Sequence, residues 1–340
     1  MMRKVLTVVR EGDGAESGRR GKLALLFPGQ GSQHPGMGRR LYEASRAARR
    51  VFAAADDVVG FRLSRLCFDG PRDELDDTVN TQPAIVATSV AYLAYLGEKL
   101  QALKGRLSPS FLAGHSLGQF TAAVAAEALD LADGLRLVLE RGRIMKDWAR
   151  QRPGGLATLL GMDEEEASHI CAEVSPEGEV GVAAHNAPGQ TVIAGLRPAL
   201  ETAIELARRK GARVVQLPIS VPGHIPIMRD VAAELGRTLS HVSFRDPQTP
   251  IVSNISARLL TTAEDVREEL SDQLCTAVEW ARCLLAMVNQ GVASFVEVGP
   301  GGTLSRLARR ISEGVDAYSL SEDEETALRL ASPVALGAPP

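Results

Sequence analysis

The chain has 340 residues and a mass of 36.2 kDa, and 45% of its residues are hydrophobic and 24% charged, which excludes disordered and fibrous classes. The 38 basic and 42 acidic side chains leave a net charge of −4, so we expect no nucleic-acid partner. No apolar run approaches the ~18 residues of a membrane span, and the four cysteines form no CxxC pair that would indicate a zinc site or a disulfide framework. The sequence predicts a cytoplasmic protein with no metal and no membrane partner.

Strand and helix signals alternate along the first half of the chain, after a predicted loose arm at 1–20. Short apolar runs that end at glycine indicate buried strands, and apolar residues at a helical period indicate helices. The predicted elements are strands at 22–27 and 111–113 and helices at 41–59, 83–100, 120–128 and 135–148. This alternation is typical of an α/β fold with a mostly parallel sheet.

The stretch from 151 to 220 has its own order of elements. The predicted sequence is strand 156–161, helix 163–174, strands 180–184 and 190–194, helix 198–210 and strand 213–217. That order, βαββαβ, is the ferredoxin-like pattern. Because buried strands are expected again at 250–254 and 294–298, we predict that 151–220 is a small subdomain inserted in a large domain made of 21–150 and 221–320. A peripheral C-terminal tail is expected at 321–340.

A GxSxG pentapeptide, GHSLG at 114–118, stands between a predicted strand and a predicted helix. A sharp strand-to-helix turn holds such a serine in a strained conformation, and side chains at the two glycine positions would clash. The helix that begins there also aims backbone N–H groups at developing negative charge. We interpret Ser116 as a catalytic nucleophile, and the alternative is that the pentapeptide is only a structural turn.

A serine nucleophile needs a base, and six histidines are available. His224 lies in the rigid loop VPGHIP at 221–226, where the predicted insert rejoins the large domain, and such loops often carry catalytic groups. An α/β-hydrolase usually has its histidine near the end of the domain, whereas here 99 residues follow the last one, His241. From the residues alone, a catalytic and a structural role for His224 both stay open.

Seven short motifs follow one another along most of the chain, at 27–33, 114–118, 141–145, 186–195, 221–224, 273–280 and 297–301. In this order they resemble the malonyl-CoA:acyl carrier protein transacylase family and the related acyltransferase domains of polyketide synthases. The resemblance implies an α/β-hydrolase-like large domain with an inserted ferredoxin-like subdomain. It also implies an acyltransferase that takes a coenzyme A thioester as substrate, holds no permanent cofactor and passes a malonyl or substituted malonyl group to an acyl carrier protein.

The resemblance assigns roles to residues around the pentapeptide. Ser116 would be acylated, with His224 as its base. The main-chain carbonyl of Gln273 would orient His224 in place of the usual aspartate. The backbone N–H groups of Gln30 and Leu117 would form the oxyanion hole.

The resemblance also implies which residues hold the acyl group. Arg141 would bind the free carboxylate of malonyl, although its place beside a glutamate on a helix favours a surface ion pair when judged alone. Met145 is expected in the pocket wall or the core, and Asn186 either near the cleft or only as a turn former. Gly223 stands where malonyl enzymes commonly have Ser or Phe, which would enlarge the pocket for a substituted malonate. Gln119 stands where many members have Glu, with little change expected.

We expect a monomer that binds malonyl-CoA or a related acyl-CoA and an acidic carrier protein. Arginine clusters that could dock the carrier lie at 39–40, 46–50, 208–210 and 306–310, and each is otherwise an ordinary solvated helix face. An acyl hydrolase that edits carrier proteins would also use Ser116 and His224, but it has no use for a buried Arg141. The sequence is also compatible with a trans-acting polyketide acyltransferase that uses a larger extender unit, and with a non-catalytic docking subunit.

Overall fold

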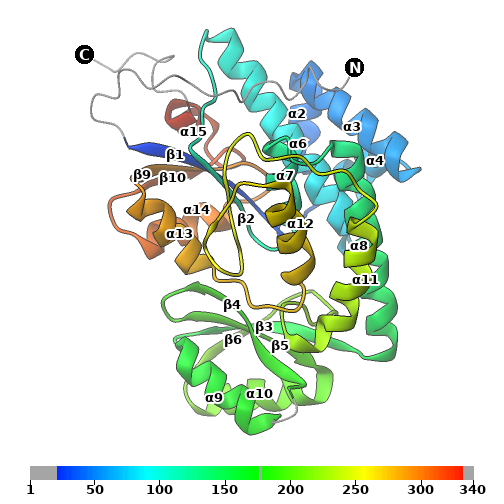
Figure 1. Ribbon diagram of the computed structural model, residues 1–340, viewed down its shortest axis with the longest axis vertical. Helices are drawn as coiled ribbons and strands as arrows, with labels where there is room; N and C mark the ends of the chain where they lie inside the picture. Colours follow the sequence, from blue (N-terminus) through cyan, green and yellow to red (C-terminus); the bar gives the residue numbers. More distant parts are fainter. Residues whose placement is uncertain (1–20, 176–177, 332–340) are drawn as a thin grey trace.

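The computed structural model describes residues 21–175 and 178–331, so the predicted arm at 1–20 and the end of the predicted tail, 332–340, lie outside the described residues. The described chain contains two sheets, one with helices on both faces and a smaller one that lies beneath it in Figure 1. The fold is a mixed α/β structure, as the alternation of strands and helices predicted.

The larger sheet has six strands in the order β10-β9-β1-β2-β7-β8. All neighbours pair in parallel except β7 and β8, which are antiparallel. The strands are β1 (Lys22–Phe27), β2 (Phe111–Gly114), β7 (Ile251–Val252), β8 (Leu259–Leu260), β9 (Val292–Glu297) and β10 (Asp316–Ser319). The mostly parallel sheet is confirmed, and β8 and β10 are strands that the sequence did not predict.

Outside the small sheet's own unit, the described chain forms helices and one 3₁₀ turn, which lie against the larger sheet or pack on the helices that do (Figure 1). They are α2 (Arg39–Ala44), α3 (Arg46–Val59), α4 (Leu63–Asp69), α5 (Arg72–Asp76), α6 (Thr78–Ala102), α7 (Gly118–Ala125), α8 (Leu131–Gln151), η1 (Pro226–Met228), α11 (Arg229–Leu239), α12 (Ala263–Asp272), α13 (Trp280–Asn289), α14 (Thr303–Ile311) and α15 (Glu324–Ala331).

The central strand β1 is buried on both faces. Leu25 and Phe27 pack in one core with residues of α3, α6 and α8, whereas Ala24 and Leu26 pack in a second core with residues of α13 and α14. Side chains alternate between the two faces of a strand, so both must be apolar when both are covered. This is why the unbroken apolar run at 23–27 predicted the strand correctly.

The smaller sheet is antiparallel, in the order β4-β5-β3-β6. Two helices pack on its outer face, at the bottom of Figure 1. The elements are β3 (Gly154–Leu160), α9 (Glu164–Val174), β4 (Val180–Ala187), β5 (Gln190–Leu196), α10 (Arg197–Arg209) and β6 (Arg213–Gln216). The predicted order of strands and helices in this stretch is confirmed, and β4 joins the rest of the chain through a bridge from Ala184 to Val278.

The predicted single helix at 41–59 is wrong, because the chain breaks at Ser45. This residue has an extended backbone (φ −132°, ψ 130°), and its side chain accepts a hydrogen bond from the N–H of Ala48, which caps α3. The helix predicted at 83–100 begins earlier, at Thr78, because the Asp77 side chain accepts from the N–H of Val79 and caps α6 there. The short helices α4 and α5 were not predicted, since neither is long enough to show a period.

Part of the predicted tail is packed against the large sheet. The helix α15 buries Ala327 and Ala331 in the core, and the hydroxyl of Tyr95 donates to Glu324. The expectation of a peripheral tail is therefore wrong for residues 324–331.

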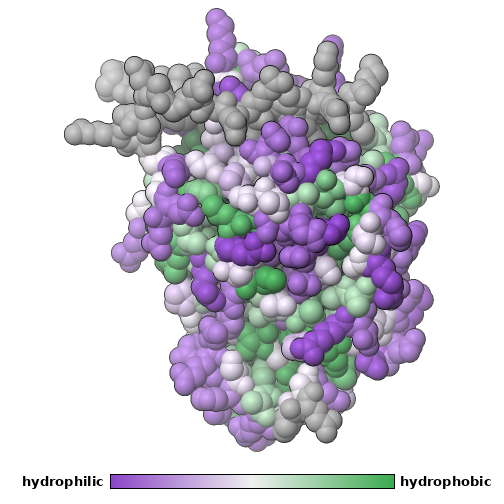
Figure 2. Space-filling model, viewed as in Figure 1, coloured by the Kyte–Doolittle hydropathy of each residue, from purple (hydrophilic) through white to green (hydrophobic). Residues whose placement is uncertain are grey.

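The described surface offers little continuous apolar area. On the face in Figure 2, hydrophobic residues form small groups among hydrophilic ones. The exposed large hydrophobic side chains come from separate elements: Tyr42, Phe61, Leu103, Val215 and Leu285. Over residues 21–175 and 178–331, no helix combines the length and the apolar character needed to cross a bilayer.

Candidate active site

Ser116 lies at the sharp turn between β2 and α7. Its φ of 53° is a left-handed conformation that side chains seldom adopt. The glycines on either side leave no room for a side chain, since a Cβ on Gly114 would lie 1.9 Å from the carbonyl carbon of Gly118, and one on Gly118 would lie 2.1 Å from the carbonyl oxygen of Phe27. The strand, strained serine and helix are those that the pentapeptide predicted.

The structure brings His224 to Ser116. The Oγ of Ser116 lies 2.6 Å from Nε2 of His224, and Nδ1 of His224 lies 2.5 Å from the main-chain oxygen of Gln273. Because a carbonyl can only accept, Nδ1 carries the proton and Nε2 is free to accept from the serine hydroxyl. The N–H of His224 also donates to the oxygen of Leu274 (2.8 Å), so ring and backbone are tied to the same segment.

The environment of His224 favours a neutral ring. Burial, and then the nearby cation of Arg141, lower its pKa from 6.5 to about 3, against the opposing effect of the Gln273 carbonyl. A neutral imidazole is the form that can take a proton from a hydroxyl. The ring is therefore ready to act as a base at neutral pH.

Two backbone N–H groups lie beside the serine. Leu117 directly follows it at the start of α7, and Gln30 lies in the loop after β1, where its side chain donates to the Oγ of Thr78 (3.0 Å). The loop approaches closely, because a Cβ on Gly29 would lie 2.5 Å from the oxygen of His115. Within the described part of the chain, the N–H groups of Gln30 and Leu117 have no protein acceptor.

Arg141, on α8, is 1% exposed, so the alternative of a surface ion pair is wrong. Its guanidinium donates to Oε1 of Gln82 (2.8 Å) and lies 5.8 Å from the ring centre of Phe120. The Nε atom is buried and has no partner among the described residues. Burial lowers the pKa of Arg141 to about 10, which still leaves a cation at neutral pH. A buried cation with a spare N–H is suited to a ligand carboxylate.

These groups share a cavity of about 280 Å³. Ser116, His224, Arg141 and Gln30 line it, and so do three further predicted residues, Met145, Asn186 and Gly223. Leu117 and Gln273 instead contribute backbone atoms next to it.

Asn186 contacts the site through His115. The Nε2–H of His115 donates to Oδ1 of Asn186 (2.8 Å), and its ring meets Trp280 edge to face at 5.2 Å between centroids. Burial lowers the pKa of His115. Gly223 faces open space, since a Cβ there would meet nothing within 4 Å.

Known proteins resemble the chain over most of its length. Residues 24–325 match the acyl transferase domain family. The chain is 39% identical over 311 residues to the malonyl CoA-acyl carrier protein transacylase of Bacillus subtilis (strain 168), which covers 91% of this chain and 96% of that one. It is 35% identical over 310 residues to that of Escherichia coli (strain K12), covering 91% and 99%. The chain belongs to the malonyl CoA-acyl carrier protein transacylase family, and it is an acyltransferase.

Solved structures of transacylases have the same fold. The crystal structure from Xanthomonas oryzae pv. oryzae is 39% identical, with a TM-score of 0.85 over 92% of this chain and 98% of that one. A malonyl-transacylase in complex with a type II PKS acyl-carrier protein is 36% identical, also with a TM-score of 0.85, over 92% and 99%.

Two residues of this acyltransferase contact the site without having been predicted. Gln82 binds Arg141, and Asn254 accepts a hydrogen bond from the N–H of Ser116 (2.7 Å). Gln82 is one of several polar residues in the first turns of α6, so the sequence does not single it out. Asn254 ends the stretch expected to be a buried strand, and a buried polar residue there is the one signal that could have indicated it. In residues 21–175 and 178–331, no group of three or more His, Cys, Asp or Glu side chains could hold a metal, and the four cysteines are free thiols.

Proposed function

We propose that this acyltransferase moves a malonyl group from coenzyme A to the phosphopantetheine thiol of an acyl carrier protein through an ester on Ser116. The observation that carries the proposal is the buried guanidinium of Arg141 in the cavity that also holds Ser116 and His224. The names of the relatives support the same donor and acceptor.

In the first half-reaction, the Oγ of Ser116 attacks the thioester carbonyl while Nε2 of His224 takes the hydroxyl proton. The carbonyl oxygen becomes an oxyanion, which the N–H groups of Gln30 and Leu117 stabilise, and each such donor is worth roughly 10²–10³ in rate. The carbon–sulfur bond then breaks, and the departing coenzyme A thiolate takes the proton from His224. In the second half, the carrier thiol gives its proton to His224 and attacks the ester carbonyl. The bond from that carbon to Oγ of Ser116 then breaks, and Oγ takes the proton back from His224, which restores the free serine and gives ping-pong kinetics.

Arg141 selects the acyl group in this proposal. A malonyl carboxylate pairs with the guanidinium, whereas an acetyl group would leave a buried cation unpaired. The carboxylate would also offset the cation that lowers the pKa of His224, so the base strengthens when the charged acyl group is bound.

The carrier docks, in our proposal, beside α14. Three residues of this helix line the cavity: Thr303, Leu304 and Leu307. The arginines of the cluster at 306–310 lie on the same helix. Arg310 also holds the β4–β5 turn, since its guanidinium donates to the oxygen of Pro188 (2.8 Å). This cluster at 306–310 is the one of the four predicted clusters that shares a helix with the cavity.

We interpret the larger sheet with its helices as an α/β-hydrolase-like domain formed by 21–150 and 221–320, and the smaller sheet at 151–220 as a ferredoxin-like insert. The Ser116 elbow after β2 and the βαββαβ order support these two descriptions. We also propose that the enzyme is monomeric and cytoplasmic. It uses a coenzyme A thioester as substrate and holds no resident cofactor.

Gly223 favours a second candidate, an acyltransferase that accepts a larger extender unit. The open space beside its Cα would admit a substituent on the malonyl carbon. Competition among malonyl-CoA, methylmalonyl-CoA and acetyl-CoA for one carrier, with the loaded acyl group identified by mass spectrometry, separates the two candidates.

Transfer is tested against hydrolysis with malonyl-CoA and a phosphopantetheinylated acyl carrier protein. We expect malonyl on the carrier and little free malonate, and neither product with the Ser116→Ala variant. Release of free malonate with the carrier left unloaded would overturn transfer in favour of the editing hydrolase.

A further inference from the structure

Two buried amide side chains hold the backbone of the turn at Ser116. Oδ1 of Asn254 accepts from the N–H of Ser116 (2.7 Å), and its Nδ2 donates to the oxygen of Gly114 (2.5 Å). From α7, Oε1 of Gln119 accepts from the N–H of Gly114 (3.0 Å). These bonds stabilise the strained, left-handed conformation of Ser116.

One carboxylate, that of Glu269 on α12, contacts both of these residues. Its Oε1 accepts from the N–H of Asn254 (2.6 Å) and from Nε2 of Gln119 (3.2 Å), and its Oε2 accepts from the hydroxyl of Ser253 (2.7 Å). Glu269 is 3% exposed. Nε2 of Gln119 also donates to the oxygen of Val252 (3.0 Å), and these two acceptors orient the amide so that its Oε1 faces Gly114.

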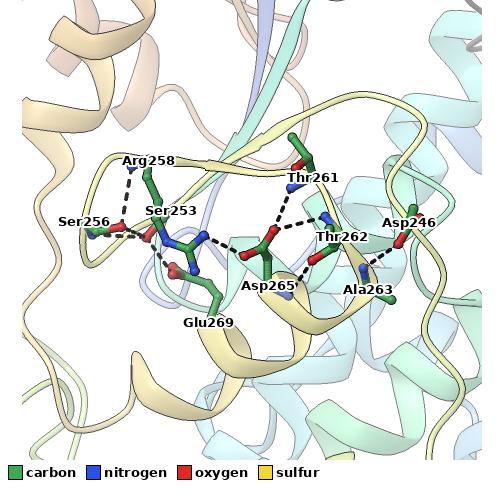
Figure 3. A network of polar contacts seen from close by, with 9 residues as sticks. All are labelled: Asp246, Ser253, Ser256, Arg258, Thr261, Thr262, Ala263, Asp265 and Glu269. Atoms are coloured by element: carbon green, nitrogen blue, oxygen red, sulfur yellow. Dashed lines mark hydrogen bonds and ion pairs between the residues drawn. The ribbon is translucent and has the colours of Figure 1, made fainter.

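Contacts at the start of α12 fix the position of Glu269 (Figure 3). The guanidinium of Arg258 donates to Asp265 (2.6 Å), and Asp265 forms a capping box with Thr262. At the first residue of the helix, the N–H of Ala263 donates to Asp246 (2.8 Å). In Figure 3, Glu269 points from α12 toward Ser253 in the loop that follows β7.

The same helix also reaches His224. Gln273 lies one turn after Glu269 and is joined to it by a backbone hydrogen bond of 3.1 Å. Its carbonyl is the group that accepts from Nδ1 of His224. The two sides of the Ser116–His224 pair are therefore attached to one helical turn of α12.

We propose that Glu269 is a positioning residue for acyl transfer, which fixes the nucleophile turn through Asn254 and Gln119 while Gln273, at the end of the same helical turn, fixes the base. This inference rests on the proposed role of Ser116 as nucleophile. Gln119 and Glu269 act as an amide–carboxylate pair, so the effects of changing them are coupled.

The test exchanges the two groups. Gln119→Glu alone places two carboxylates in contact in a dry site. Glu269 therefore overturns the expectation that Glu and Gln at position 119 differ little, and we expect the rate of Ser116 acylation to fall roughly 100-fold or more. Glu269→Gln alone leaves donors without a charged acceptor, and we expect a loss of roughly 10-fold to 100-fold. The double variant Gln119→Glu/Glu269→Gln keeps one carboxylate and one amide, so it should be at least about 10-fold faster than Gln119→Glu. Glu268→Gln, an exposed neighbour on α12, is the matched control and should acylate at the wild-type rate.

Two rates are measured on each variant below its unfolding transition. One is single-turnover acylation by malonyl-CoA, and the other is labelling of Ser116 by a fluorophosphonate, with Ser116→Ala as the blank. A positioning role predicts that both rates fall while the KM for malonyl-CoA stays within about threefold. A merely structural role predicts a lower melting temperature with wild-type rates in the folded protein.

Wild-type rates in folded Glu269→Gln, or a double variant no faster than Gln119→Glu, would overturn the proposal. If Glu269→Gln does not fold, Gln119→Ala, which removes only one link, gives the same comparison, and slowed labelling supports the proposal while an unchanged rate overturns it. The fluorophosphonate contains neither malonyl nor coenzyme A. If the fluorophosphonate labels Ser116 of the wild-type protein but malonyl-CoA does not acylate it, the proposed function is contradicted, whereas this inference is not.

Discussion

Under the proposed function, the cavity has a nucleophile side around Ser116 and an acyl side around Arg141, and the two are held in different ways. On the nucleophile side, Gln119 and Asn254 occupy the backbone groups around Ser116 with buried hydrogen bonds. On the acyl side, Arg141 keeps an Nε with no partner among the described residues, and Gly223 faces open space. The first arrangement fixes the geometry of the serine that reacts. The second leaves space and a hydrogen-bond donor for the acyl group. Changes on the first side should slow transfer of every acyl group, and changes on the second should alter which group is accepted.

The largest effect is expected from His224→Ala. Without the base at 2.6 Å from Oγ, acylation should fall roughly 10⁴-fold for malonyl-CoA and acetyl-CoA alike. Rapid-quench mass spectrometry of the acyl-enzyme measures both rates, with the exposed His241→Ala as control. A loss confined to one acyl group would break the distinction between the two sides.

Arg141→Ala should change selectivity. Malonyl transfer is expected to fall at least about 10-fold, because the carboxylate loses its cation, whereas acetyl transfer is spared or rises. The control is Arg143→Ala on the same helix, whose side chain is exposed and pairs with Glu140. Equal losses for the two acyl groups, measured as kcat/KM, would mean that Arg141 is structural.

Gly223→Phe tests whether position 223 limits the size of the acyl group that is accepted. A ring in the open space beside position 223 should lower methylmalonyl transfer by about 10-fold relative to malonyl transfer. The measurement is competition between the two acyl-CoA donors for one carrier, and Gly223→Ala should give a smaller shift in the same direction. An unchanged product ratio would remove Gly223 from the acyl pocket.

The smallest effect is expected from pH. In a histidine with a pKa of 6.5, only about one ring in 30 would be neutral at pH 5. Burial and Arg141, however, lower the pKa of His224 to about 3. Acylation should therefore change less than about twofold between pH 7 and pH 5. A rate that halves near pH 6.5 would contradict the neutral, buried base.

The free energy of unfolding, unlike the acylation rate, should depend on pH. Because the folded pKa of His224 lies below its unfolded value, the unfolded chain binds a proton below pH 6.5 that the folded chain does not. This residue therefore lowers the free energy of unfolding as pH falls from 6.5 toward 3. Urea unfolding at pH 7 and pH 5 should show a larger loss for the wild type than for His224→Ala.

Local patterns predicted the parts of the fold that depend on neighbouring residues. The pentapeptide at 114–118 indicated strand, turn and helix because its glycines are required by contacts within that turn and with β1. The order of elements from 154 to 216 followed from clear changes between strand and helix periods. The break at Ser45 was missed because a serine suits both a helix and its cap.

The rest of the site depends on contacts between distant residues. Asn254 lies 138 positions from Ser116, and Glu269 lies 150 positions from Gln119, yet both pairs are hydrogen-bonded. Asn254 ends a stretch that was expected to be a buried strand, but nothing in the sequence pairs it with Ser116. Glu269 belongs to a helix whose other acidic residues are mostly exposed. Glu269 gains its role from the packing of α12 against α7 and against the loop that follows β7.

The most direct test is the intact mass of the protein after a brief reaction with malonyl-CoA, followed by peptide mapping. We predict one added malonyl group, carried by Ser116, that disappears when a carrier thiol is supplied and never forms on Ser116→Ala. A malonyl group on another residue, or an equal gain in mass by Ser116→Ala, would contradict the acyl-enzyme on which the account depends.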